Sequence, residues 1–193
     1  MENKRLLLII DPQIDFISGT LPVPNAGEAM AELARYVANQ GSDYTTIVAT
    51  TDWHPYHHMS FATENGPWPV HCVQNSIGAA LPDDLIAACS NSGCPFVVLR
   101  KGNSADREEY SIMQNAASAA LLDEIIGKEG ITEIHVCGLA GNICVLNTLR
   151  DLVGKYGKAM LRVLADYAPS LDDGTELAQY LSENGIMTLR SRM

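Results

Sequence analysis

The 193-residue sequence has no long hydrophobic run and few basic residues, and each shortage excludes a class of protein. No apolar stretch approaches the roughly 20 residues that a helix needs to span a bilayer, so a membrane-spanning protein is not expected. Lysine and arginine number 13 against 23 aspartate and glutamate residues, which gives a formal net charge of −10. Nucleic acids and anionic membrane surfaces both attract basic proteins, so neither is an expected partner.

Cysteine is also scarce, and the five present, an odd number at irregular spacing, do not form the pattern of a disulfide framework. The N-terminal MENKRLLLIID carries basic residues before an apolar run. That run, about six residues, is too short for the hydrophobic core of a signal peptide. We therefore expect a reducing, cytoplasmic setting. No repeat or linker interrupts the chain, so residues 1–193 are expected to form a single domain.

Short apolar segments alternate with helical patterns along the chain. The expected strands are 6–11, 45–52, 95–101, 133–139, 160–166 and, more weakly, 185–190. The expected helices are 26–40, 115–130, 143–156 and 174–185, with a short one near 82–89. Asn25 is predicted to cap the first helix and Gly41 to end it. The alternation predicts a three-layer α/β/α fold, in which helices cover both faces of a six-stranded, mainly parallel sheet.

Reactive side chains follow the first four predicted strands. Asp11, Asp52 and Lys101 end three of them, and a small-residue turn leads from the next to Cys144. Ligands of open α/β sheets bind at the carboxyl ends of the strands, so we expect these residues to converge on one edge. Each also has an ordinary interpretation: a turn residue for Asp11, a solvated strand end for Lys101 and a core residue for Cys144.

The surroundings of Cys144 suit a nucleophile. Small residues at 138–141 permit a tight turn, and Asn142 is a candidate cap for the helix that follows. A cysteine in the first turn of a helix lies near the positive end of the helix dipole, which favours the thiolate. Free N–H groups of the turn are candidates for an oxyanion hole. Beside the thiol, Lys101 would lower its pKa and Asp11 would accept its proton. The other cysteines are interpreted as structural: Cys72, Cys89, Cys94 and Cys137.

The segment TDWHPYHHMSFATENGPWPVHC (51–72) holds four of the five histidines. Asp52 and His54 can face the same way just after a strand, and His71 can return from the loop to join them. One oxygen and two imidazole ligands suit Zn²⁺, Mn²⁺ or Fe²⁺ and leave coordination positions open. The alternative is a polar loop whose histidines cap backbone groups. Further candidate ligands in this segment are His57, His58 and Glu64.

Taken together, these motifs resemble the isochorismatase-like cysteine hydrolases, specifically the nicotinamidase/pyrazinamidase family. The matching segments run nearly end to end: LLIIDPQIDF (7–16), TDWHPYHHMSF (51–61), WPVHCVQNSIGAAL (68–81), RKG (100–102) and CGLAGNICV (137–145). The combination of DWHP…HxSF with WPVHC is specific, because isochorismatase-type relatives lack this metal set. The resemblance implies the strand order 3-2-1-4-5-6. It also implies hydrolysis of nicotinamide, a small carboxamide, to nicotinate and ammonia through a thioester.

The resemblance further implies roles for individual residues. The catalytic residues are Asp11, Lys101 and Cys144. The metal ligands are Asp52, His54 and His71, with zinc expected and manganese or iron as alternatives. The substrate-binding residues are Gln13, Phe16, Trp68 and Ala140. A cis peptide bond is expected at Leu139–Ala140, where it would help aim the N–H groups of Ala140 and Cys144 at the substrate oxygen.

The chain departs from the family pattern at two places. The turn reads Gly141-Asn142-Ile143, where the family usually has Thr-Asp and then an aromatic residue or histidine. Ile112 and Met113 stand where a small residue and Phe are common. These positions predict a reshaped substrate pocket with unchanged chemistry.

Other interpretations stay open. The nearest is an amidohydrolase that acts on another small carboxamide. An Asp/His/His set also occurs in non-heme Fe(II) oxygenases, usually on a double-stranded β-helix, where Cys144 would have no role. A third is a metal-binding module without activity. Helices rich in Met, Leu and Ile are compatible with a homo-oligomer, but no surface can be assigned to it.

Overall fold

Six parallel strands form the centre of the computed structural model, which describes residues 3–190. The strands are β1 (Arg5–Ile10), β2 (Thr46–Asp52), β3 (Phe96–Lys101), β4 (Glu133–Gly138), β5 (Leu161–Leu164) and β6 (Met187–Leu189). Their order across the sheet is β3-β2-β1-β4-β5-β6, and every pair of neighbours is parallel. The predicted strand order is therefore confirmed.

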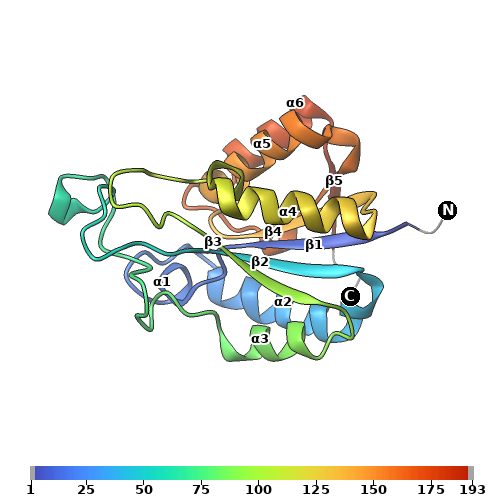
Figure 1. Ribbon diagram of the computed structural model, residues 1–193, viewed down its shortest axis with the longest axis horizontal. Coiled ribbons are helices and arrows are strands. Elements are labelled where there is room, and N and C mark those ends of the chain that lie inside the picture. The colour runs from blue at the N-terminus through green and yellow to red at the C-terminus, as the bar shows by residue number, and fades with distance from the viewer. Residues whose placement is uncertain (1–2, 191–193) are drawn as a thin grey trace.

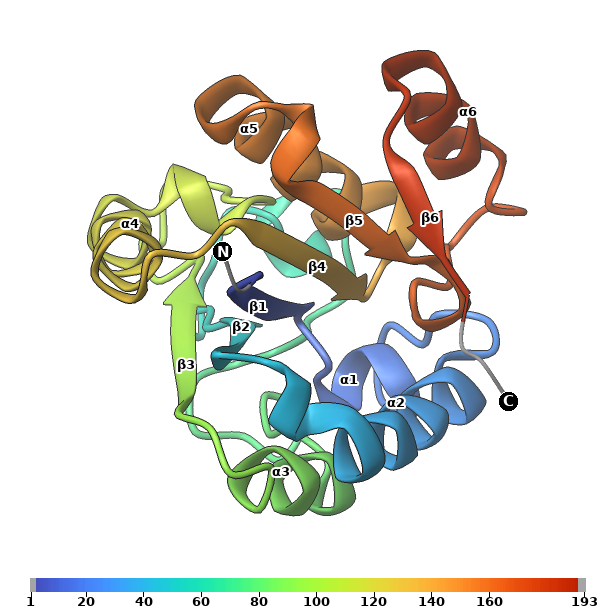
Figure 2. The same cartoon turned by 90° about the vertical axis from the view of Figure 1, so that its right-hand side faces the viewer.

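Helices cover both faces of this sheet, as Figures 1 and 2 show. One face carries α4 (Ala116–Glu129), α5 (Leu146–Tyr156) and α6 (Thr175–Asn184). The other carries α1 (Ile14–Ile17), α2 (Ala26–Gln40) and α3 (Asp83–Ser90). Short helical turns complete the chain: η1 (Gly41–Asp43), η2 (Ala62–Glu64), η3 (Ile112–Gln114), η4 (Gly141–Val145), η5 (Lys158–Met160) and η6 (Ala165–Tyr167). This confirms the predicted three-layer α/β/α architecture.

The central strands are apolar because they face a helical layer on each side. Along β1, Leu6 and Leu8 pack with the layer that contains α4, whereas Leu7 and Ile9 pack with the layer that contains α2. Side chains of a strand alternate between its faces, so the residues of β1 from Leu6 to Ile10 are all buried. Each fully buried Leu or Ile contributes about 1.5–3 kcal/mol to stability through lost contact with water.

Helix boundaries differ from the prediction at α2. Asn25 precedes the helix in the left-handed conformation, with φ 64°, and its side chain makes no capping hydrogen bond. Gly41 keeps a helical φ of −60° and opens η1 instead of stopping the chain. Asparagine tolerates left-handed backbone as readily as it caps, so its position alone did not decide between the two roles.

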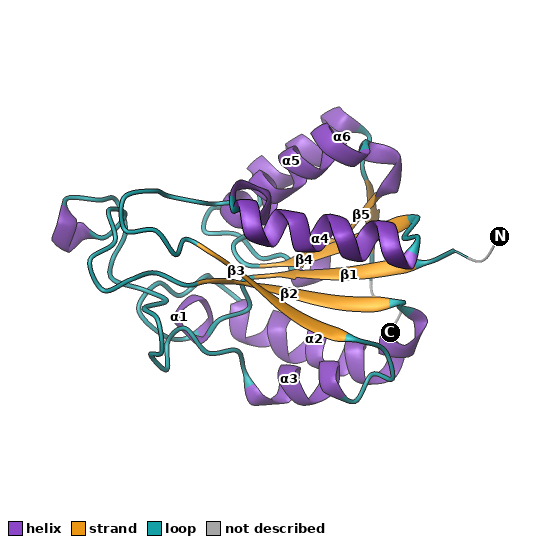
Figure 3. Cartoon of the chain, viewed as in Figure 1, coloured by secondary structure: helices purple, strands orange, loops and turns teal. Residues whose placement is uncertain are grey.

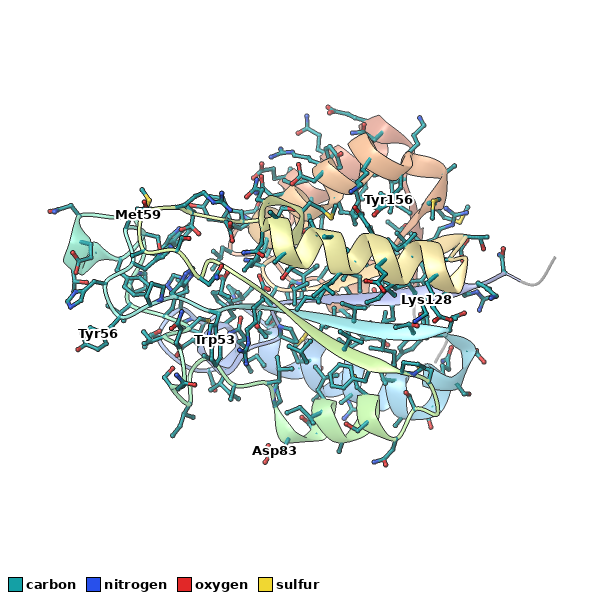
Figure 4. All side chains as sticks on the ribbon, in the orientation of Figure 1. Trp53, Tyr56, Met59, Asp83, Lys128 and Tyr156 are labelled. Atoms are coloured by element: carbon teal, nitrogen blue, oxygen red, sulfur yellow. The ribbon has the colours of Figure 1, made fainter. Side chains whose placement is uncertain are left out.

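The longest loops gather at one end of the sheet, where β1, β2 and β3 terminate (Figure 3). The segment 53–82, between β2 and α3, contributes most of them. Figure 4 shows Tyr56 and Met59 on the outer part of this segment and Trp53 closer to the sheet. No helix among residues 3–190 is both long and apolar enough to cross a membrane.

Candidate active site

Asp11, Lys101 and Cys144 meet beyond the ends of β1, β3 and β4. The Nζ atom of Lys101 lies 2.9 Å from Asp11 Oδ2 and 3.6 Å from Cys144 Sγ. The exposed fractions of these residues are 0% for Asp11 and Lys101 and 5% for Cys144. The convergence expected from the strand ends is therefore present, while the catalytic roles stay predictions.

Asp52, at the end of β2, connects these three residues to the candidate metal ligands His54 and His71. Its Oδ1 forms an ion pair with Lys101 Nζ, and its Oδ2 lies 3.6 Å from His54 Nε2. The potential ligand atoms of Asp52, His54 and His71 all lie within 4.8 Å of one another, and all three residues are buried. Asp11, Asp52 and Cys144 form a similar cluster, but there the ammonium of Lys101 already supplies a cation.

Backbone carbonyl groups orient the imidazoles of His54 and His71. Nδ1 of His54 lies 3.0 Å from the carbonyl oxygen of Gly102, and Nδ1 of His71 lies 2.7 Å from that of Pro69. A carbonyl oxygen only accepts, so each Nδ1 carries the proton and each Nε2 keeps a free lone pair. Nε2 of His54 is buried without a hydrogen-bond partner. This arrangement is typical of metal-binding histidines, so the donor set fits a divalent metal.

The additional candidate ligands lie outside this set. His58 is buried, but its ring nitrogens are 2.7 Å from Ser60 Oγ and 3.0 Å from the carbonyl oxygen of Arg107. Glu64 instead pairs with the exposed His57, at 2.7 Å. The ring nitrogens of His58 and the carboxylate of Glu64 are therefore paired within the loop, and the His58 ring packs against that of His54 with their centroids 4.0 Å apart.

Burial is the largest influence on the pKa values of Asp11, Lys101 and Cys144. Burial raises the pKa of the Cys144 thiol well above its usual value, although the nearby Lys101 ammonium opposes this. Burial likewise raises the pKa of Asp11. At Lys101 burial opposes the charge, but the carboxylates of Asp11 and Asp52 raise its pKa well above the usual value. Burial therefore opposes the thiolate that the helix terminus and Lys101 are expected to favour, and that expectation stays a prediction. A carboxylate oxygen of Asp11 lies within 4.8 Å of the Cys144 sulfur, so Asp11 is the adjacent group suited to accept the thiol proton.

A cavity opens onto Cys144, and Phe16, Trp68 and Ala140 line it, as does Ile143 of the divergent turn. The indole N–H of Trp68 donates to the Tyr110 hydroxyl at 3.1 Å. Cavity residues that the sequence reasoning did not single out are Leu21, Val23, Glu108, Tyr110 and Leu171. They come from irregular segments without periodic patterns. Only Glu108 and Tyr110 lie close to Ile112 and Met113, where the chain departs from the family pattern.

Gln13 does not line this cavity, contrary to its predicted place among the substrate-binding residues. Its fully buried amide donates from Nε2 to the carbonyl oxygens of Asp52 and Ala79 and accepts from the Asp52 N–H through Oε1. A side chain whose donors and acceptor are already paired has little capacity left for a ligand. Gln13 instead fixes the backbone that carries Asp52.

The turn before Cys144 has the expected cis peptide bond at Leu139–Ala140. The predicted helix start at 143 is displaced: η4 is a π-helical turn, and α5 begins at Leu146. Asn142 does not cap the helix, because its Oδ1 accepts the N–H of Leu171 at 2.9 Å. A Cβ at Gly141 would lie 2.4 Å from the carbonyl oxygen of Ala168, so only glycine permits this close approach.

The remaining cysteines fit their structural interpretation. All five cysteines are free thiols. Cys72, Cys89 and Cys137 are buried, and Cys94 is half-buried.

A parallel α/β/α sheet with a buried aspartate, lysine and cysteine at one edge is the arrangement of the isochorismatase-like cysteine hydrolases. The sequence profile of the isochorismatase domain family matches residues 5–159, and the chain belongs to this family. The sheet is not the double-stranded β-helix on which the oxygenase interpretation depended.

Within the family, the chain is similar to nicotinamidases and pyrazinamidases. It is 32% identical to the nicotinamidase of Escherichia coli K12, with 76% of this chain and 75% of the relative covered. It is 30% identical to the nicotinamidase/pyrazinamidase of Mycobacterium tuberculosis, with 90% and 91% covered. Among solved structures, the pyrazinamidase of Pyrococcus horikoshii in complex with zinc has a TM-score of 0.79 and 29% identity, with 97% and 99% covered. PnC1 of L. infantum in complex with nicotinate has a TM-score of 0.81 and 30% identity, with 98% and 94% covered. The chain thus belongs to the nicotinamidase/pyrazinamidase branch and is a hydrolase of an amide C–N bond.

Proposed function

We propose that this protein hydrolyses nicotinamide to nicotinate and ammonia through a thioester on Cys144. The observation that carries the proposal is the buried Asp11–Lys101 ion pair beside the Cys144 sulfur, at a cavity lined by Phe16 and Trp68. The relatives named nicotinamidase and the nicotinate complex of the L. infantum protein support a pyridine carboxamide as substrate. The cytoplasmic setting and a homo-oligomeric state stay predictions from the sequence.

We also propose that Asp52, His54 and His71 hold a divalent metal, zinc first and manganese or iron as alternatives. The zinc complex of the Pyrococcus horikoshii relative supports this choice, as does the free, buried Nε2 of His54. When bound, the metal supplies a Lewis acid for the ring nitrogen of the substrate. The bond-making and bond-breaking steps belong to the residues of the chain itself.

In the first half of the reaction, Asp11 accepts the proton of the Cys144 thiol, and the sulfur attacks the carboxamide carbon. The C–S bond forms while the carbonyl electron pair moves onto oxygen. The N–H groups of Ala140 and Cys144 donate to this oxyanion, a contribution of roughly 3–4 kcal/mol for each donor. Asp11 then gives its proton to the amide nitrogen, the C–N bond breaks, and ammonia leaves behind a thioester.

In the second half, Asp11 takes a proton from a water molecule that adds to the thioester carbon. Asp11 returns that proton to the sulfur as the C–S bond breaks, and the product carboxylic acid loses its own proton to solvent and leaves as nicotinate. Lys101 stays cationic throughout, because two carboxylates face its Nζ, and it balances the negative charge on Asp11 and on the sulfur. Phe16 and Trp68 hold the ring so that the amide faces Cys144.

Ammonia release from nicotinamide by the zinc-loaded protein tests this function. We expect Cys144→Ala to lower turnover by at least about a thousandfold, since it removes the atom that forms the intermediate. Cys94→Ala is the matched control, because it removes a half-buried thiol outside the cavity, and it should keep the wild-type rate. Absence of ammonia with the wild type, or undiminished turnover by Cys144→Ala, would contradict the proposal.

A different small carboxamide is the second candidate substrate, because Ile143 and Leu171 give the cavity an apolar wall beside Cys144. A panel that contains nicotinamide, pyrazinamide and aliphatic carboxamides separates the two candidates by kcat/KM. A higher kcat/KM for another member of the panel would support the same reaction mechanism with that carboxamide as the substrate.

A further inference from the structure

Glu109 is a buried carboxylate that the proposed mechanism does not use. It lies in the loop between β3 and η3, and its exposed fraction is 1%. Its Oε2 accepts the N–H of Gly102 at 2.8 Å and the Nδ2 of Asn115 at 2.9 Å, and its Oε1 pairs with the guanidinium of Arg107. Burying a carboxylate costs free energy unless hydrogen bonds or an opposite charge compensate it. Gly102, Asn115 and Arg107 provide this compensation for Glu109.

Gly102 connects Glu109 to both halves of the candidate active site. Its carbonyl oxygen accepts from Nδ1 of His54, and the residue before it is Lys101. Its φ is +68°, and a Cβ at this position would lie 2.5 Å from Cε1 of His54. The peptide backbone therefore touches the imidazole directly, and a shift of Gly102 moves the carbonyl group that orients His54.

Asn115 gives the carboxylate a rigid support. Its Oδ1 accepts the N–H of Ser118 and caps α4, while its Nδ2 donates to Glu109. The hydroxyl of Ser118 donates to the carbonyl oxygen of Arg100, close to the end of β3, at 2.6 Å. Glu109 is thus held between the start of α4 and the end of β3, the two elements that lie side by side in Figures 1 and 2.

We propose that Glu109 is a positioning residue which, through the Gly102 peptide, fixes the tautomer and orientation of His54 and the place of the Lys101 ammonium. The inference rests on the proposed function only in taking His54 as a metal ligand. It does not depend on which carboxamide is hydrolysed. Outer partners of metal-binding histidines commonly change metal affinity by 10–100-fold when they are removed.

Three substitutions separate the backbone contact from the ion pair. Glu109→Leu keeps a similar volume and removes the acceptor, whereas Glu109→Gln keeps an acceptor oxygen. Arg107→Ala is the control, because it removes the ion pair and leaves the contacts to Gly102 and Asn115 in place. The measurements are zinc affinity by competition with a chelator, the His54 tautomer from ¹⁵N chemical shifts of the metal-free protein, and kcat.

We expect Glu109→Leu to weaken zinc binding by about 10–100-fold and to give a mixed His54 tautomer. Glu109→Gln and Arg107→Ala should stay close to the wild type. If Glu109→Leu does not fold, Glu109→Asp, which shortens the reach to Gly102, takes its place with the same expectation.

Wild-type zinc affinity with an unchanged His54 tautomer in Glu109→Leu or Glu109→Asp overturns the inference. So does an equal loss of affinity in Arg107→Ala. A wild type that releases no ammonia from nicotinamide, but whose variants follow the expected order of zinc affinity, contradicts the proposed function and supports the role of Glu109.

Discussion

At the scale of single residues, the two carboxylate oxygens of Asp11 have different partners. Oδ1 accepts the hydroxyl of Thr50 at 2.7 Å, and Oδ2 faces Lys101 Nζ at 2.9 Å. The backbone N–H of Asp11 is also directed at Thr50, 3.1 Å from its carbonyl oxygen. Thr50 therefore fixes the plane of the carboxylate, so that one oxygen stays available on the side of the thiol.

We expect Thr50→Val to lower kcat by about tenfold or more, because a hydrogen bond to a charged group contributes about 1.5–3 kcal/mol. Valine has nearly the shape of threonine but cannot donate. Steady-state kinetics of ammonia release measure the effect, with thermal unfolding as a check on the fold. Thr50→Ser keeps the hydroxyl and should retain most of the rate; equal rates for Thr50→Val and the wild type would show that Asp11 needs no such support.

The residues that share the sheet edge could be predicted from the sequence, because parallel strands bring their carboxyl ends together. Asp11 directly follows β1, and Asp52 and Lys101 are the last residues of β2 and β3, so the sequence pattern already placed the three together. The direction of a side chain could not be predicted in the same way. The family resemblance placed Gln13 among the substrate-binding residues, whereas its amide is directed at the backbone of Asp52.

At the scale of elements, a buried polar chain joins α2, the start of β2 and β4. The Tyr36 hydroxyl is 2.7 Å from the Tyr44 hydroxyl, which is 2.8 Å from Nδ1 of His135. Nε2 of His135 is 2.8 Å from Oε1 of Glu133. Burial lowers the pKa of His135, although Glu133 opposes this.

This shift predicts that the protein loses stability in mild acid. The unfolded chain titrates its histidines near pH 6.5, and His135 binds a proton less readily when folded. Its contribution is therefore complete above about pH 7 and decreases as the pH falls through about 6.5 towards the folded pKa. Urea unfolding between pH 7.5 and 5.5 should show a smaller loss in His135→Gln than in the wild type. Identical pH slopes would assign the acid sensitivity to other groups.

Strand positions were predictable because their apolar runs are short and continuous, but helix termini were not. Asn142 and Asn115 both precede a helix, yet only Asn115 caps one with its side chain. The difference lies in tertiary contacts, since Asn142 bonds Leu171, a residue far along the chain. The π-helical turn η4 likewise depends on packing around Ala140 and Gly141, which no local pattern encodes.

At the scale of the whole molecule, one edge of the sheet carries the proposed chemistry and the sheet itself carries the stability. The long loops lie beyond β1, β2 and β3, where they add His71, Trp68 and Tyr110 to the strand-end residues. The helical layers bury the strands from Leu6 to Val163 without contributing a charged group to the Lys101 cluster. Because of this separation, the hydrophobic pattern of the sequence predicts the fold. It does not predict the cavity wall, which is formed by loops without such a pattern.

Asp52 faces Lys101 on one side and the proposed histidine ligands on the other, so we expect metal binding and loss of the thiol proton to be thermodynamically linked. A cation bound at Asp52 would weaken the ion pair between Asp52 and Lys101. The ammonium of Lys101 would then interact more strongly with Asp11 and Cys144. By reciprocity, a metal that eases loss of the thiol proton binds more tightly once that proton has left. Zinc binding should then release more protons from the wild type than from Cys144→Ala, as calorimetry in buffers of different ionisation enthalpy can measure. Equal release would mean that Asp52 insulates the two halves of the site instead of coupling them.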